Sequence, residues 1–306
     1  MRLDLTGWTV GVELEGTALC ADRGGTPVEV AGLVREAGEQ GNLIGLTGEV
    51  GLHQFELHCG GFPLLASEGS LGWWEGHVRN FFPRRGVVPV FSSVSPLWTP
   101  EHGAPTVPVE SLPRCAAILA AIDKMTKEPG RGLALFGQTA GHNALQFHLR
   151  PPGYESKDFF GPLGVAVVNA FACQGLAPWF EAEHLSDAGA RVHNHYNREG
   201  FWSLAPGRGP TDGPYTVESL IERWMRIPRL VRHEGDEWLV DLGLPTLEEV
   251  CRTGLYGTVW ERVRPSPERS DKPATIEVRL WGAVRPEAVV WVLQNQIIPT
   301  LESIRL

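Results

Sequence analysis

The 306-residue sequence has few cysteines, and their arrangement excludes two common structural roles. The five cysteines are widely spaced and odd in number, and no Cys-x-x-Cys motif occurs, which argues against a disulfide framework and a thiolate zinc site. The chain also lacks a Walker A loop and a G-x-G-x-x-G motif, so those two nucleotide-binding designs are excluded. We interpret the cysteines as reduced thiols in a cytoplasmic protein.

Long apolar runs and an excess of positive charge are also missing. Apolar stretches such as 164–172 are far shorter than a membrane span, and Asp4 places an acid where a signal peptide needs basic and apolar residues. The net charge of −9 disfavours non-specific binding to nucleic acid or to a membrane surface. We therefore expect neither partner, whereas divalent cations are compatible with this charge.

What the chain does have is the composition of a globular protein, with 42% hydrophobic and 21% charged residues. The length fits one large domain or two ordinary ones, and in the absence of repeats or long linkers we assign residues 1–306 to a single domain. Capping boxes at Thr26 and Thr246 predict two helix starts, and Pro113 predicts a third. The apolar segment 164–177 predicts a buried helix.

Four segments alternate between apolar and polar residues, which predicts β-strands with one buried face. These segments are 8–15, 54–58, 145–150 and 276–280. Their polar positions are Glu13, Glu15, Gln54, Glu56, His58, Gln146, His148, Glu277 and Arg279. Each strand alone also fits an antiparallel sheet with one face in water. By the same parity, His58 shares a face with Glu56 and His53 does not.

Taken together, the polar positions differ from an ordinary solvated face. They contain no lysine, and they combine carboxylates with imidazole and amide groups, which are ligands for hard divalent cations. Carboxylates brought close together repel one another and raise one another's pKa values unless cations neutralise them. If the strands converge, bound metal ions would neutralise these carboxylates, so we expect a metal site.

The same segments resemble, in order, the motifs of the glutamate–cysteine ligases and related carboxylate–amine ligases. Residues 11–15 (GVELE) resemble the G-x-E-x-E strand that opens this family, and residues 49–57 resemble its second acidic motif. Residues 144–149 resemble the T-x-x-Q-x-N-L-D or T-H-x-H-V-G strand, and residues 274–279 are similar to the late E-x-R strand. Residues 224–231 resemble the segment that lies between the last two.

The resemblance implies an α+β fold of the glutamine synthetase/guanido kinase kind. In that fold a curved antiparallel sheet forms a funnel or half-barrel, with helices packed on its convex side. ATP and two or three Mg²⁺ ions would occupy the concave face. The metal ligands it implies are Glu13, His148 and Glu277 for one ion, and Glu15, Glu49 and Glu56 for another.

Further roles follow from the resemblance. Arg279 would contact the nucleotide phosphates, and Arg279 and Glu56 would take part in catalysis. Gln146 would belong to the nucleotide site. Arg191 and Arg198 are further candidates there, because arginine binds phosphate and carboxylate through two hydrogen bonds, although arginines on an ordinary surface are an equal alternative.

The function implied is an ATP-dependent carboxylate–amine ligase that forms an amide bond through an acyl phosphate. Its substrates would be a small-molecule carboxylate and an amine of amino-acid type, and assembly into a homo-oligomer is left open. One alternative is a binding protein on the same scaffold that has lost turnover. Another is a metal-dependent hydrolase, which would need an activated water, usually on zinc held by two or more histidines.

Overall fold

The computed structural model describes residues 2–21, 25–99, 103–172, 214–257, 263–270 and 272–306. The strands are β1 (Thr9–Cys20), β2 (Leu46–Gly48), β3 (Gln54–Pro63), β4 (Val87–Val90), β5 (Ala144–Arg150), β6 (Val231–Glu234), β7 (Glu237–Val240), β8 (Val263–Ser266) and β9 (Thr275–Gly282). The α-helices are α1 (Val30–Glu39), α2 (Glu68–Phe81), α3 (Pro113–Thr126), α4 (Arg131–Thr139), α5 (Pro162–Ala172), α8 (Val217–Met225), α9 (Leu247–Thr253), α10 (Pro286–Val292) and α11 (Ile298–Ser303). A π-helical turn, Leu293–Ile297, joins the last two helices.

The main sheet is antiparallel throughout, and β1 is its organising strand. The strand order is β2-β3-β1-β5-β9-β8, and β4 pairs with the far end of β1. Among the described strands the sheet is open rather than closed into a barrel. The chain thus combines helices with an antiparallel sheet, while the funnel or half-barrel shape stays a prediction.

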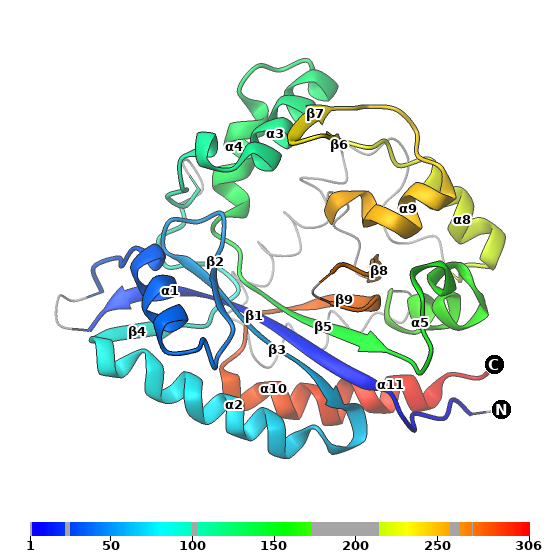
Figure 1. Cartoon of the computed structure of the whole chain (residues 1–306), viewed down its shortest axis with the longest axis horizontal. Coiled ribbons are helices and arrows are strands. Elements are labelled where there is room, and N and C mark those ends of the chain that lie inside the picture. The colour runs from blue at the N-terminus through cyan, green and yellow to red at the C-terminus, as the bar shows by residue number, and fades with distance from the viewer. Residues whose placement is uncertain (1, 22–24, 100–102, 173–213, 258–262, 271) are drawn as a thin grey trace.

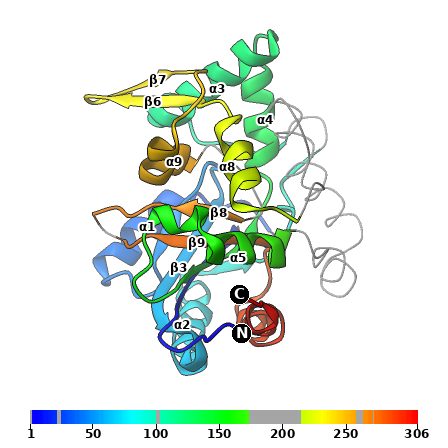
Figure 2. The ribbon, with the colours of Figure 1, turned by 90° about the vertical axis from the view of Figure 1, so that its right-hand side faces the viewer.

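The two faces of the sheet have different coverings. Figure 1 shows α2 and the α10–α11 segment along one face, and α3, α4, α8, α9 and the β6–β7 hairpin beyond the other. The view turned by 90° keeps these two groups on opposite sides of the sheet (Figure 2). The apolar residues of β1 belong to the main core with α2 and α10, since Val10, Val12 and Leu14 are buried together with Trp74 and Val289. The alternate residues of β1, which include the acids Glu13 and Glu15, therefore face the second group of elements.

A smaller apolar core lies in that second group of elements. Ile118 and Ile122 of α3 pack with Leu230 and Val231 at the start of the β6–β7 hairpin. The assignment of residues 1–306 to one catalytic domain stays a prediction. Within the described ranges, no helix combines the length and the apolar character needed to cross a bilayer.

The helix starts agree with the sequence at two of the three predicted positions. Pro113 is the first residue of α3, and Thr246 caps α9 in a complete capping box. The capping box predicted at Thr26 is wrong, because α1 begins only at Val30 and has no side-chain cap. The Cys20 N–H donates to the Thr26 carbonyl at 2.7 Å, and the Val28 N–H donates to Ala18 at 3.0 Å. These bonds extend the β1 pairing and hold 26–28 out of helical conformation.

Candidate functional site

The register of β1 and β3 sets acidic residues directly opposite one another. Glu13 pairs with His58, and Glu15 pairs with Glu56. Residues paired across neighbouring antiparallel strands point to the same face of the sheet, with their Cβ atoms about 5 Å apart. Two carboxylates of β1 and one of β3 are therefore forced together by hydrogen bonding of the backbone.

The six metal ligands expected from the sequence lie in two groups on this face. In each group, one ligand atom from every residue lies within 4.8 Å of the others. The first group is Glu13, His148 and Glu277, and the second is Glu15, Glu49 and Glu56. We call these six residues the carboxylate site. Their convergence on one face, which the strand parity predicted, is observed, whereas metal binding stays a prediction.

The first group joins three strands. His148 of β5 pairs with Glu277 of β9, and β5 in turn lies beside β1. The His148 Nε2 atom is 2.9 Å from Glu13 Oε1. Yet His148 Nε2 and Glu277 Oε1 are both buried and have no hydrogen bond of acceptable geometry within the described part of the chain. Buried polar atoms normally have a hydrogen-bond partner. Two such atoms in one group, neither with a hydrogen bond of good geometry, fit ligands of a shared cation.

The second group surrounds Glu15, whose carboxylate is held by neutral donors. Gln146 Nε2 donates to Oε1 at 2.9 Å, and the Ala144 N–H donates to Oε2 at 2.9 Å. Gln54 Nε2 lies 3.4 Å from the same Oε2. The β5–β9 register shifts between Leu145 and Phe147, beside Gln146, and such irregularities re-aim side chains next to functional sites. The role of Gln146 toward a nucleotide stays a prediction.

Electrostatics divide the carboxylate site into two halves. Burial, reinforced by the Glu49 carboxylate, raises the pKa of Glu15 to about 8 and the pKa of Glu56 well above its ordinary value. Burial also opposes ionisation of Glu13, but His148 and other cationic neighbours outweigh it and hold the Glu13 pKa well below its ordinary value. The half that contains Glu15 and Glu56 thus favours protonated carboxyl groups, and a bound divalent cation would favour their ionised form.

His58 adds a third group of ligand atoms, with Glu13 and Glu56, that meets the same 4.8 Å criterion. His58 Nε2 is 3.3 Å from Glu56 and 3.0 Å from the hydroxyl of Thr47, and its Nδ1 is 3.7 Å from Glu13. These contacts agree with the parity that put His58 on the same face as Glu56. Burial lowers the pKa of His58, which favours the neutral ring that ligates metals.

Two arginines flank Glu277. Arg279, on the same strand, has its Nε 3.4 Å from Glu277 Oε1, and Arg264 of β8 donates from Nε to Glu277 Oε2 at 2.7 Å. Burial is the largest influence on Glu277, but Arg264 and Arg279 outweigh it, so the pKa of the carboxyl is lowered. The pair places two guanidinium groups beside the carboxylate site, where an anionic group could meet them.

Sequence reasoning missed Arg264 and Lys272. Arg264 lies in a four-residue strand that contains Pro265, too short for alternation to be visible. Lys272 lies outside any strand and reaches Glu13 Oε1 at 3.7 Å. Only the pairing of β8 with β9, which sets Arg264 opposite Glu277, could have identified the arginine. Two of the predicted nucleotide ligands, Arg191 and Arg198, lie outside the described residues.

The chain is similar in structure to a known protein. No family model matches the chain, and no curated protein matches it. The crystal structure of a bifunctional glutathione synthetase from Pasteurella multocida is similar with a TM-score of 0.41 and 12% sequence identity. The match covers 90% of this chain and 35% of that one, so the chain spans about a third of the length of that protein.

Proposed function

We propose that the protein is an ATP-dependent carboxylate–amine ligase that forms amide bonds between small amino-acid-like substrates through an acyl phosphate. We also propose the glutamine synthetase-like half-barrel as its fold, with the carboxylate site on the concave face. The observation that supports this most is the convergence of six ligand side chains, from four strands and the loop between β2 and β3, in two adjacent groups.

The residues fit a site for two or three Mg²⁺ ions. Oxygen ligands dominate the donor set, and among the described residues His148 Nε2 and Glu277 Oε1 are buried without a hydrogen bond of acceptable geometry. Glu13, His148 and Glu277 would hold one ion, and Glu15, Glu49 and Glu56 another. When bound, the ions would offset the negative charge that develops on the transferred phosphoryl group.

The chain's own residues would orient and neutralise the substrates. Arg279, with Arg264 beside it, would donate hydrogen bonds to phosphate oxygens. A carboxylate substrate would attack the γ-phosphorus of ATP, releasing ADP and giving an acyl phosphate. An amine would then attack the acyl carbon, with loss of phosphate and a proton. Cys59 is unsuited to nucleophilic catalysis, because burial raises its pKa to about 12.

The deciding experiment measures ADP release and traps the intermediate. The purified chain is incubated with ATP, Mg²⁺ and a panel of amino acids, with hydroxylamine as the amine. We expect ADP only when all components are present, together with an acyl hydroxamate. The Glu277→Gln variant should be inactive, while the exposed Glu110→Gln variant should keep full activity. Phosphate release that needs no carboxylate would refute the acyl-phosphate mechanism.

A second candidate function is a metal-dependent hydrolase. The observation that favours it is the position of two imidazoles, His148 and His58, on either side of Glu13. Zinc hydrolases commonly use histidines with a carboxylate and an open ligand position. Hydrolysis of an ester or amide substrate with Zn²⁺ alone, without ATP, would favour this function over the ligase.

A further inference from the structure

Thr275 makes a contact that the proposed mechanism does not use. It is the first residue of β9, and its Oγ1 lies 2.9 Å from Nδ1 of His148. Thr275 stands two residues before Glu277, so the two side chains share a face of the strand. The hydroxyl therefore reaches the histidine from the side of the ring opposite to the Nε2 atom that faces Glu13.

The proton on His148 decides whether the ring can bind a cation. A neutral imidazole carries one N–H and one lone pair, and only the nitrogen with the lone pair can be a ligand. If Nδ1 carries the proton and donates it to Thr275 Oγ1, the lone pair of Nε2 is directed into the Glu13–Glu277 group. If Nε2 carries the proton, that position is blocked.

A cation in the Glu13–Glu277 group would need the first arrangement. Nε2 lies 2.9 Å from Glu13 Oε1, and the His148 side chain is only 10% exposed. Without a cation, an N–H on Nε2 could donate to this carboxylate, whereas a cation bound at Nε2 would take the place of that proton and leave the ring proton on Nδ1. The Nδ1–H would then have an acceptor at hydrogen-bonding distance in Thr275.

We propose that Thr275 is a positioning residue that accepts a hydrogen bond from Nδ1–H of His148 and so fixes the tautomer and ring orientation needed for Nε2 to bind a cation. This inference rests on the proposed metal site. Partners of this kind orient metal-binding histidines in other proteins, and their loss typically weakens metal binding by about 10- to 100-fold. Thr275 itself touches neither the cation nor the substrate.

The test compares three substitutions in the full chain. Thr275→Val keeps the shape and removes the hydroxyl, Thr275→Ala removes both, and Thr275→Ser keeps the hydroxyl. Mn²⁺ binding is measured without nucleotide, by electron paramagnetic resonance of the free ion. We expect Thr275→Val and Thr275→Ala to weaken the affected site by about 10- to 100-fold, and Thr275→Ser to stay within about threefold of the parent protein. Thr9→Val, at the start of β1, is the matched control.

A second readout observes the tautomer directly. Nitrogen-15 NMR of histidine-labelled protein loaded with Mg²⁺ should show His148 protonated at Nδ1 in the parent protein and in Thr275→Ser. Parent protein with the proton on Nε2, or Thr275→Val with unchanged Mn²⁺ affinity, would overturn the role of Thr275 while leaving the metal site intact. Parent protein that binds no Mn²⁺ would overturn the metal site, and this inference with it.

Discussion

Glu13 and Glu56 lie in the same site, but their environments shift their pKa values in opposite directions. Glu13 is partly buried, yet His148, Lys272 and His58 favour its ionised form and lower its pKa. Glu56 is buried beside other carboxylates, so its pKa is raised. Glutamine resembles protonated glutamate in shape and charge, so substitution by glutamine separates the two cases.

At the scale of the residue, we expect the two glutamine variants to shift stability in opposite directions. In metal-free protein at pH 7.5, Glu56→Gln should raise the free energy of unfolding by about 1 kcal/mol or more, because it removes a charge that the folded state resists. Glu13→Gln should lower it by roughly 1–3 kcal/mol, because it leaves His148, His58 and Lys272 without the carboxylate that they contact. Urea denaturation in EDTA measures both.

The control for this pair is Glu110→Gln, because Glu110 is exposed. It should change stability by no more than about 0.5 kcal/mol. Both site variants should lose ligase turnover in the presence of Mg²⁺ and ATP. A destabilising effect of similar size in Glu13→Gln and Glu56→Gln would contradict the electrostatic division of the site and mark both residues as structural.

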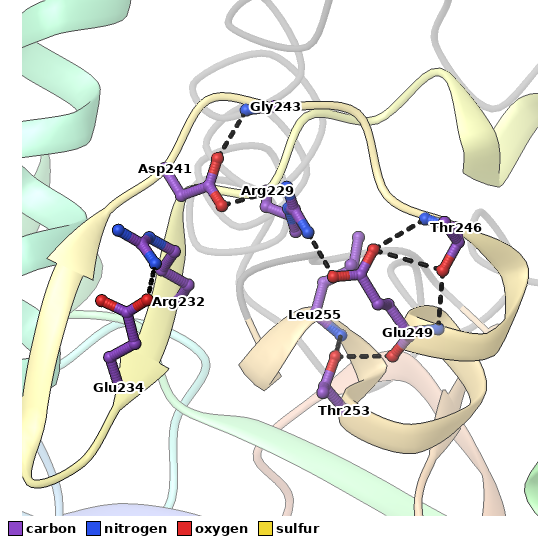
Figure 3. A network of polar contacts seen from close by, with 9 residues as sticks. All are labelled: Arg229, Arg232, Glu234, Asp241, Gly243, Thr246, Glu249, Thr253 and Leu255. Atoms are coloured by element: carbon purple, nitrogen blue, oxygen red, sulfur yellow. Dashed lines mark hydrogen bonds and ion pairs between the residues drawn. The ribbon is translucent and has the colours of Figure 1, made fainter.

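At the scale of the element, α9 illustrates how a local sequence signal fixes one end of a helix. Thr246 Oγ1 accepts from the Glu249 N–H at 3.2 Å, and Glu249 Oε2 accepts from the Thr246 N–H at 2.8 Å. The same Glu249 also pairs with Arg229, which reaches Asp241 at 3.0 Å (Figure 3). The cap therefore ties α9 to both ends of the β6–β7 hairpin.

We expect Thr246→Ala to lower the free energy of unfolding by about 1 kcal/mol, because it leaves the first turn of α9 without its side-chain acceptor. Thr246→Ser retains the hydroxyl and should stay close to the parent protein. Thermal unfolding monitored by circular dichroism measures the difference. If serine and alanine destabilise the protein equally, the cap contributes nothing to stability.

The elements also show which parts of the structure were predictable from the sequence. Thr246 initiates its helix as predicted, through a complete capping box, whereas pairing with β1 displaces the helix start expected at Thr26. Alternation placed Glu13, Glu15 and Glu56 on one face, because the period of a strand is two. Arg264 could not be found in this way, since its position depends on strand order, which is a tertiary property.

At the scale of the whole molecule, the carboxylate site should control how stability depends on pH. Glu15 has a folded-state pKa of about 8, above its ordinary value of 4.5. A carboxyl with a raised pKa binds its proton more tightly when folded, so stability falls as pH rises from the unfolded pKa to the folded one. His58, whose pKa is lowered, acts in the opposite direction only below about 6.5.

We therefore expect metal-free protein to lose stability steadily between pH 6.5 and pH 8. Urea midpoints measured in EDTA across that interval should fall, and saturating Mg²⁺ should reduce the slope. The Glu15→Gln variant should show a shallower slope than the parent protein in EDTA. A parent protein whose midpoint is flat or rises across this interval would show that Glu15 ionises with its ordinary pKa.

The strand order has a consequence for how the protein is made. β1 is synthesised first, but β9, which supplies Glu277, is synthesised near the end and reaches the sheet through β5. In a nascent chain, the apolar face of β1 is not covered by α10 and α11 until those helices have been made. Such long-range pairing slows folding and exposes aggregation-prone strands. Building one site from an early and a late strand thus delays completion of the sheet until β9 has been made.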